Sequence, residues 1–112
     1  MKIHCKIWAN AKTEEKTRKL LERVKQKIDE DLSDVKIEPY PKINGFVAGF
    51  DLVTENENWS DAVVETITLA QSVAYHWHIG GTIRDELAIY SDKTAIPGIV
   101  SMEMTLFKNT KG

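Results

Sequence analysis

The stretch from residue 34 to residue 54 limits most narrowly how this chain can fold. It contains Asn44-Gly45 between two apolar runs. This dipeptide favours a type I′ turn, because both central positions of that turn need a positive φ. We therefore predict an antiparallel hairpin. Pro39 and Pro41 have no backbone N–H to donate to a neighbouring strand, so the first strand of the hairpin should lie at a sheet edge. In its second strand, one face carries Phe46, Ala48, Phe50 and Leu52.

In the segment before the hairpin, the pattern of apolar residues changes from strand-like alternation to helical spacing. Residues 2–8 alternate and place Ile3, Cys5 and Ile7 on one face, as in a half-buried strand. Beyond them, apolar residues recur at helical spacing, and Thr13 is a suitable N-cap. A helix is therefore predicted over residues 13–32.

The segment after the hairpin predicts a second helix, over residues 59–78. Asn58 or Ser60 would cap its start, and Gly80-Gly81 would stop it. Two strands should follow. They are "ELAIYS" at 86–91 and "GIVSMEMTLF" at 98–107, the latter with inward-facing Val100, Met102, Met104 and Leu106.

The resulting order of elements is β-α-β-β-α-β-β, which predicts an α+β fold. Its first six elements match the ferredoxin-like arrangement, an antiparallel sheet with two helices on one face. The C-terminal strand is expected as an addition at the sheet edge opposite the proline-containing strand. A length of 112 residues, with 42% hydrophobic and 29% charged residues, fits a single globular domain over residues 1–112.

The composition also bears on where the protein acts. Cys5 is the only cysteine, so no internal disulfide can form. Charged residues interrupt the N-terminal segment where a signal peptide would need an apolar run, and no apolar run is long enough to span a membrane. We expect a cytoplasmic protein without membrane association.

The histidines raise the question of a metal or acid–base site. His76 and His78 flank Trp77 near the end of the second predicted helix, where residues two apart point roughly 200° apart. A strand would instead place both on one face. We interpret them as helix-end residues. His4 and Cys5 should face opposite ways, with Cys5 buried, so no metal site, cofactor or catalytic group is predicted.

Charge is distributed unevenly along the chain, although the net charge is only -2. Residues 43–83 contain five acidic residues and no Lys or Arg, which argues against direct binding of nucleic acid. This block is either a solvated loop with Trp59 packed onto the helix or a binding patch for a basic protein. The predicted contacts are Asp51, Glu55, Glu57, Trp59, Asp61 and Glu65, with Asp85, Glu86 and Asp92 as secondary ones.

The segments "NWSDAVVETITLAQSVAYHW", "HIGGTIRDELAIYSD" and "GIVSMEMTLF" together resemble the immunity proteins of bacterial contact-dependent growth inhibition and related polymorphic-toxin systems. The resemblance implies a cytoplasmic, non-enzymatic inhibitor that binds a cognate toxin, often a basic nuclease, and blocks its active site. It implies no particular functional residue. The free protein is expected to be a monomer or a weak dimer.

An alternative hypothesis is a small ferredoxin-like enzyme or ligand-binding domain that dimerises through its sheet. Its acid–base candidates are His78, Tyr90 and Glu103.

Overall fold

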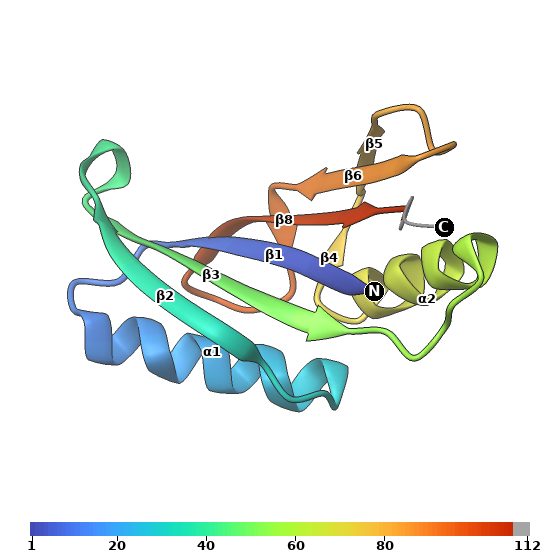
Figure 1. The fold of residues 1–112 in the computed structure, drawn as a ribbon. Coiled ribbons are helices and arrows are strands. Elements are labelled where there is room, and N and C mark those ends of the chain that lie inside the picture. The colour runs from blue at the N-terminus through green and yellow to red at the C-terminus, as the bar shows by residue number, and fades with distance from the viewer. Residues whose placement is uncertain (109–112) are drawn as a thin grey trace.

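The computed structural model describes residues 1–108, which form an α+β fold as predicted (Figure 1). The elements follow one another in the order β1 (Lys2–Ala9), α1 (Glu14–Ile28), β2 (Ser33–Tyr40), the 3-10 helix η1 (Pro41–Ile43), β3 (Gly45–Val53), α2 (Trp59–Gln71), β4 (Ala74–Tyr75), β5 (His78–Gly80), β6 (Glu86–Ser91), β7 (Lys93–Thr94) and β8 (Ile99–Phe107). No helix within residues 1–108 is long and apolar enough to cross a membrane.

The main sheet is antiparallel and has the strand order β2-β3-β1-β8-β6-β5. Strand β2, which contains Pro39, lies at the edge as predicted. The predicted place of the C-terminal strand was wrong, because β8 lies inside the sheet between β1 and β6. Strand β8 is long enough to pair with β1 from Ile3↔Leu106 to Ala9↔Ile99, whereas β6 has only six residues. A small second sheet joins β4 to β7.

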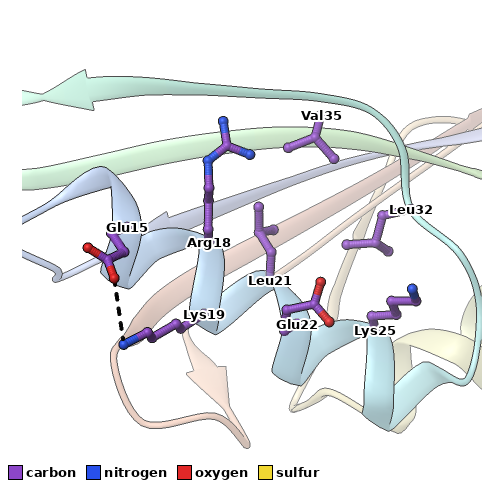
Figure 2. Close-up of a pocket in the computed structure, with 8 residues that line it drawn as sticks. All are labelled: Glu15, Arg18, Lys19, Leu21, Glu22, Lys25, Leu32 and Val35. Atoms are coloured by element: carbon purple, nitrogen blue, oxygen red, sulfur yellow. Dashed lines mark ion pairs between the residues drawn. The ribbon is translucent and has the colours of Figure 1, made fainter.

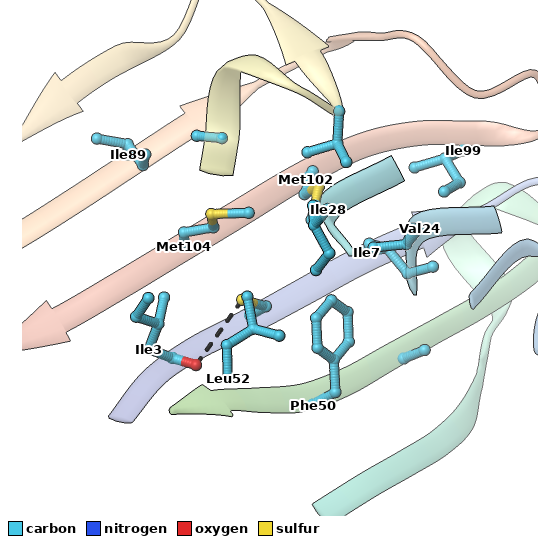
Figure 3. Packing of buried hydrophobic residues seen from close by; sticks show 14 of the residues in the cluster. Ile3, Ile7, Val24, Ile28, Phe50, Leu52, Ile89, Ile99, Met102 and Met104 are labelled. Carbon is cyan, nitrogen blue, oxygen red and sulfur yellow. Dashed lines mark hydrogen bonds between the residues drawn. The ribbon is translucent and has the colours of Figure 1, made fainter. Parts of the chain in front are cut away.

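The hydrophobic core lies between the sheet and the two helices. The predicted alternation of β1 is confirmed, since Ile3, Cys5 and Ile7 are all buried. Figure 3 shows their neighbours converging from the adjacent strands and from α1, among them Val24, Ile28, Phe50, Leu52, Met102 and Met104. Residues of α2 belong to the same cluster, so both helices cover one face of the sheet. The opposite face carries no helix of the described residues 1–108.

One inward-facing assignment on β8 was wrong. Val100 is 44% exposed, whereas Met102, Met104 and Leu106 are buried as predicted. The register between β1 and β8 shifts at this point, with Trp8 opposite Ser101 and Ala9 opposite Ile99. The shift leaves Val100 as the extra residue of a β-bulge, and alternation alone does not reveal a bulge.

The hairpin is confirmed, but its turn is not the predicted type I′ turn. Residues Pro41–Ile43 form η1, and Asn44 alone takes a left-handed conformation with a φ of 51°. Gly45 already pairs with Tyr40 in the ladder. Its lack of a side chain serves another purpose, since a Cβ there would lie 2.0 Å from the carbonyl oxygen of Ala9. Glycine is therefore required by close packing against the end of β1.

Both helices start where predicted and end earlier. The Thr13 side chain accepts a hydrogen bond from the Lys16 N–H, at 3.1 Å, and caps α1. This helix ends at Ile28 instead of residue 32, because Asp29 turns left-handed with a φ of 56°. Asn58 caps α2 by accepting from the Asp61 N–H, at 3.2 Å.

Helix α2 ends at Gln71, so the predicted extension to residue 78 was wrong. The chain leaves the helix because Val73 and Ala74 pair with a distant segment. The Ala95 N–H donates to the Val73 carbonyl at 2.8 Å, and Ala74 pairs with Thr94. Gly80-Gly81 is therefore no helix stop: it lies at the end of β5 and in the turn that follows.

Candidate binding surface

The connection between β3 and α2, residues 54–58, is held by side-chain hydrogen bonds. The Glu65 carboxylate accepts from the Thr54 hydroxyl and from the Asn56 amide, each at 2.5 Å. The Thr54 oxygen also accepts from the Asn56 N–H, at 3.1 Å. Glu65 is thus a half-buried anchor for this connection, not one of the exposed contacts that the sequence suggested.

Trp59 forms the second attachment of this region. Its indole Nε1 donates to the carbonyl oxygen of Ile83 at 2.8 Å, and its half-buried ring packs against the core. The bond connects the start of α2 to the loop between β5 and β6. That loop is tightly turned, with Ile83 at a φ of 59° and its N–H bonded to the Glu86 carbonyl. A positive φ is rare for a β-branched residue, so no sequence pattern pointed to Ile83.

Three carboxylates of the predicted patch are exposed on this braced region. They are Glu55 and Glu57 on the connection and Asp61 in the first turn of α2. Within residues 1–108, none of the three forms an ion pair. The loop that Trp59 holds adds the exposed Arg84 and Asp85. We call Glu55, Glu57, Asp61 and Asp85 the acidic surface.

The other predicted contacts lie elsewhere. Asp51 is on the helix-free face of the sheet, where the Nδ1 of His4 donates to its carboxylate at 2.7 Å, and its side chain is only 16% exposed. Glu86 is half-buried at the start of β6. Asp92 follows the opposite end of that strand and is separated from Asp85 by its full length. The nine predicted residues therefore do not form one surface.

Several residues that shape the region were missed from the sequence. Thr54 and Asn56 position the connection, and Ile83 supplies the carbonyl that binds Trp59. Residues such as Thr and Asn in a loop are typical of local side-chain hydrogen bonding, which was the available signal. Their partner Glu65 is nine to eleven residues away, on the helix.

The interpretation of the two histidines as helix-end residues was wrong. His78 lies on strand β5, and His76 precedes it at a left-handed φ of 51° outside any strand. Both are exposed. No group of three His, Cys, Asp or Glu side chains in the described part of the chain is placed to hold a metal ion.

Cys5 faces the core, and His4 faces the opposite side of β1, as predicted. Burial raises the pKa of the Cys5 thiol far above its ordinary value, and the negative charge of Asp51 adds to this effect. The thiol also lies 3.8 Å from the Ile3 carbonyl oxygen. Such a thiol stays protonated and is a poor nucleophile.

The three acid–base candidates fall in one row across the sheet. His78 pairs with Tyr90, Tyr90 with Glu103, and Glu103 with Lys6. Residues directly opposite in antiparallel strands have their side chains on the same face, so all four side chains share the helix-free face. No hydrogen bond or ion pair joins them among the described residues.

A hollow of about 330 Å³ lies between α1 and β2 (Figure 2). Leu21, Leu32 and Val35 line its apolar part, and the charged side chains around it include the Glu15–Lys19 pair, at 3.9 Å. Charges of both signs alternate along the helix at this rim. This arrangement is typical of a solvated helix surface and offers no convergent reactive groups.

Comparisons with protein-family models, with curated proteins and with solved structures found no match to this chain.

Proposed function

We propose that this chain is a toxin-neutralising immunity protein of the kind found in bacterial contact-dependent growth inhibition. In this proposal it acts in the cytoplasm without catalysis and blocks the active site of a cognate basic nuclease. The observation that supports it most is that Glu55, Glu57 and Asp61 are exposed, and form no ion pair with any of residues 1–108, on a region braced by Glu65 and Trp59.

The hydrogen bonds that hold residues 54–58 favour tight binding, because this backbone is already ordered before the partner binds. A flexible acidic loop would lose conformational entropy when it docks, and this loss would weaken the complex. Here the Thr54, Asn56 and Asn58 side chains already hold the backbone of the connection. The exposed carboxylates therefore need only side-chain ordering.

Charge supports a cationic partner. An active site that binds the phosphates of nucleic acid is rich in Lys and Arg, and carboxylates can occupy the same positions as phosphates. Residues 43–83 contain no Lys or Arg, and the loop held by Trp59 brings Arg84 together with Asp85, so the four carboxylates of the acidic surface keep a net negative field. Such a field speeds the encounter with a basic protein.

Growth protection tests the proposal. The cognate toxin domain that this proposal requires, sought first among the neighbouring genes, would be produced in a bacterial host with and without this chain. We expect growth only when the chain is present. The triple variant Glu55→Lys, Glu57→Lys, Asp61→Lys should lose protection. The control Glu22→Lys, Glu30→Lys, Asp31→Lys should keep it: it reverses three exposed acids in and just after α1, of which Asp31 pairs with Lys25 at 3.4 Å. Failure of the unaltered chain to protect would refute the proposal.

The row of His78, Tyr90 and Glu103 favours a second candidate, a ferredoxin-like enzyme or ligand-binding domain. Tyr90 faces Glu103 and His78 directly across the ladder, so three groups that can exchange protons are neighbours. Native mass spectrometry of the purified protein tests this candidate. A bound metabolite that is lost on His78→Ala would support it, and a ligand-free mass would count against it.

A further inference from the structure

The helix-free face of the sheet presents apolar groups to solvent. Four of its large side chains are strongly exposed: Val53, Tyr90, Val100 and Phe107, with Phe107 at 52%. Trp8 and Tyr40 join Tyr90 and Val100 around a hollow of about 370 Å³ on the same face. The ladder register places the four in two groups, Val53 and Phe107 toward one end of the face and Tyr90 and Val100 toward the other, with His4 and Lys6 between them. Exposed apolar groups rimmed by polar residues mark an interaction surface in soluble proteins.

A second hollow on this face surrounds Gly49. It measures about 410 Å³ and is bordered by Lys6, Lys36 and Glu103. The fold does not require glycine here: its φ is not positive, and a Cβ would meet only the Cys5 carbonyl oxygen, at 3.8 Å. Glycine weakens the interior of a strand and often marks the close approach of another molecule. Gly49 therefore leaves room on the face for an incoming group.

Charges on the face differ between its two sides. On the β2-β3-β1 side, Lys2 pairs with Asp34 at 3.6 Å and Asp51 is held by His4, so Lys6 and Lys36 are the lysines outside these pairs, with Glu38 at the edge. The β8-β6-β5 half carries Glu86 and Glu103 and no Lys or Arg. A nucleic acid would meet repulsion over the second half. A second copy of this chain, turned over, would bring Lys6 of one face opposite Glu103 of the other.

We propose that two copies of this chain form a symmetric dimer through this face, about a two-fold axis that runs parallel to the strands between β1 and β8. The proposal is independent of the proposed function, because the acidic surface lies outside the face. Lys6, Glu103, Gly49 and Tyr90 occupy one row, in the order Gly49, Lys6, Glu103, Tyr90. The axis passes through the middle of this row.

The two-fold operation exchanges the two ends of the row. Lys6 of each copy then faces Glu103 of the other, and Tyr90 of each copy faces the hollow at Gly49 of the other. Each contact occurs twice, as an isologous interface requires. Two sheets stacked in this way lie about 10 Å apart with nearly aligned strands, which is ordinary sheet packing.

Charge reversal tests the pairing. By sedimentation equilibrium, the unaltered chain should have twice the monomer mass of 12.7 kDa. Lys6→Glu or Glu103→Lys alone puts like charges opposite each other and should give monomers. The double variant Lys6→Glu, Glu103→Lys restores opposite charges and should restore the dimer. Because Lys6 and Glu103 are also neighbours within one sheet, circular dichroism and thermal unfolding of each single variant check that the monomers are folded. A monomeric unaltered chain at about 1 mM, or single variants that remain fully dimeric, would overturn the proposal.

Cross-linking tests the register. A chain with both Gly49→Cys and Tyr90→Cys should form a covalent dimer with a short thiol-specific cross-linker that reaches about 8 Å between sulfurs, since facing positions lie on sheets about 10 Å apart, and neither single variant should. Within one chain these positions are three strands apart, roughly 14 Å, which is too far for this cross-linker. Absence of the covalent dimer in the double variant, or its formation in a single variant, would reject this arrangement.

Discussion

The indole Nε1 of Trp59 donates a hydrogen bond to the carbonyl oxygen of Ile83, 2.8 Å away. This contact links the first residue of α2 to a loop 24 residues later in the chain. It places Arg84 and Asp85 beside the start of α2, where Asp61 is exposed. The acidic surface is therefore assembled from two segments, and Trp59 is the residue that joins them.

Trp59→Phe should lower the free energy of unfolding by about 1–2 kcal/mol, because the smaller phenyl ring loses the hydrogen bond and part of the packing of the indole. It should also weaken binding of the partner, because the 81–85 loop is released. Trp77→Phe is the matched control, since the Trp77 indole bonds the Ala70 carbonyl at 3.0 Å, away from the acidic surface. Urea unfolding and calorimetric titration check both. Equal effects of the two variants on affinity would contradict this role of Trp59.

Glu65→Ala should cost about 1–3 kcal/mol of stability, because the buried Thr54 hydroxyl and the Asn56 amide lose their acceptor. Glu55→Ala should change stability by less than about 0.5 kcal/mol, because its side chain is exposed and unpaired. Glu65→Ala should therefore lower the stability measured by chemical denaturation, whereas Glu55→Ala should lower the affinity for the partner and leave stability almost unchanged. A stability loss at Glu55 as large as that at Glu65 would show that the two roles are not separated in this way.

Replacement by alanine should have opposite effects on stability at two glycines of β3. Gly45→Ala should be strongly destabilising, because its Cβ would overlap the Ala9 carbonyl, a backbone atom that cannot move freely. Gly49→Ala should be neutral or stabilising by about 0.5–1 kcal/mol, because the site is open and alanine loses less entropy on folding. Thermal unfolding of the two variants measures the difference. A large destabilisation by Gly49→Ala would mean that this glycine has a structural role.

Stability should fall at alkaline pH because of Cys5. Burial raises its pKa in the folded protein above the ordinary value near 9. The unfolded thiol therefore loses its proton first, and stability that is complete below pH 9 declines as the pH rises beyond it, by up to about 1.4 kcal/mol per pH unit. Cys5→Ala should remove this part of the slope. Urea unfolding at several pH values between about pH 8 and pH 11, on either side of the ordinary thiol pKa, measures how stability depends on pH. Identical slopes for the unaltered chain and for Cys5→Ala would contradict the assignment of this dependence to Cys5.

Local patterns accounted for much of the fold. The alternation of β1, the caps Thr13 and Asn58 and the edge position of the Pro39 strand all depend on residues close in sequence. The end of α2 could not be found in this way. It is set by hydrogen bonding of Val73 to Ala95, which overrides a helical pattern that continues to Trp77.

The candidate surface was predicted only in part, for the same reason. Composition identified Glu55, Glu57 and Asp61, since an absence of basic residues is visible in the sequence. It did not separate them from Glu65, which folds back onto Thr54, or from Asp51, which pairs with His4 across the sheet. Those contacts join residues 11 and 47 positions apart, and no local pattern encodes them.

The rate of association with the cognate toxin domain that the proposed function requires tests the central claim most directly. Stopped-flow mixing would compare the unaltered chain, the variant with Glu55, Glu57 and Asp61 changed to lysine, and the control with Glu22, Glu30 and Asp31 changed to lysine. The first triple variant should associate at least about 10-fold more slowly at low salt and lose most of its salt dependence. The control should remain close to the unaltered chain. Equal rates for the two triple variants would contradict binding through the acidic surface.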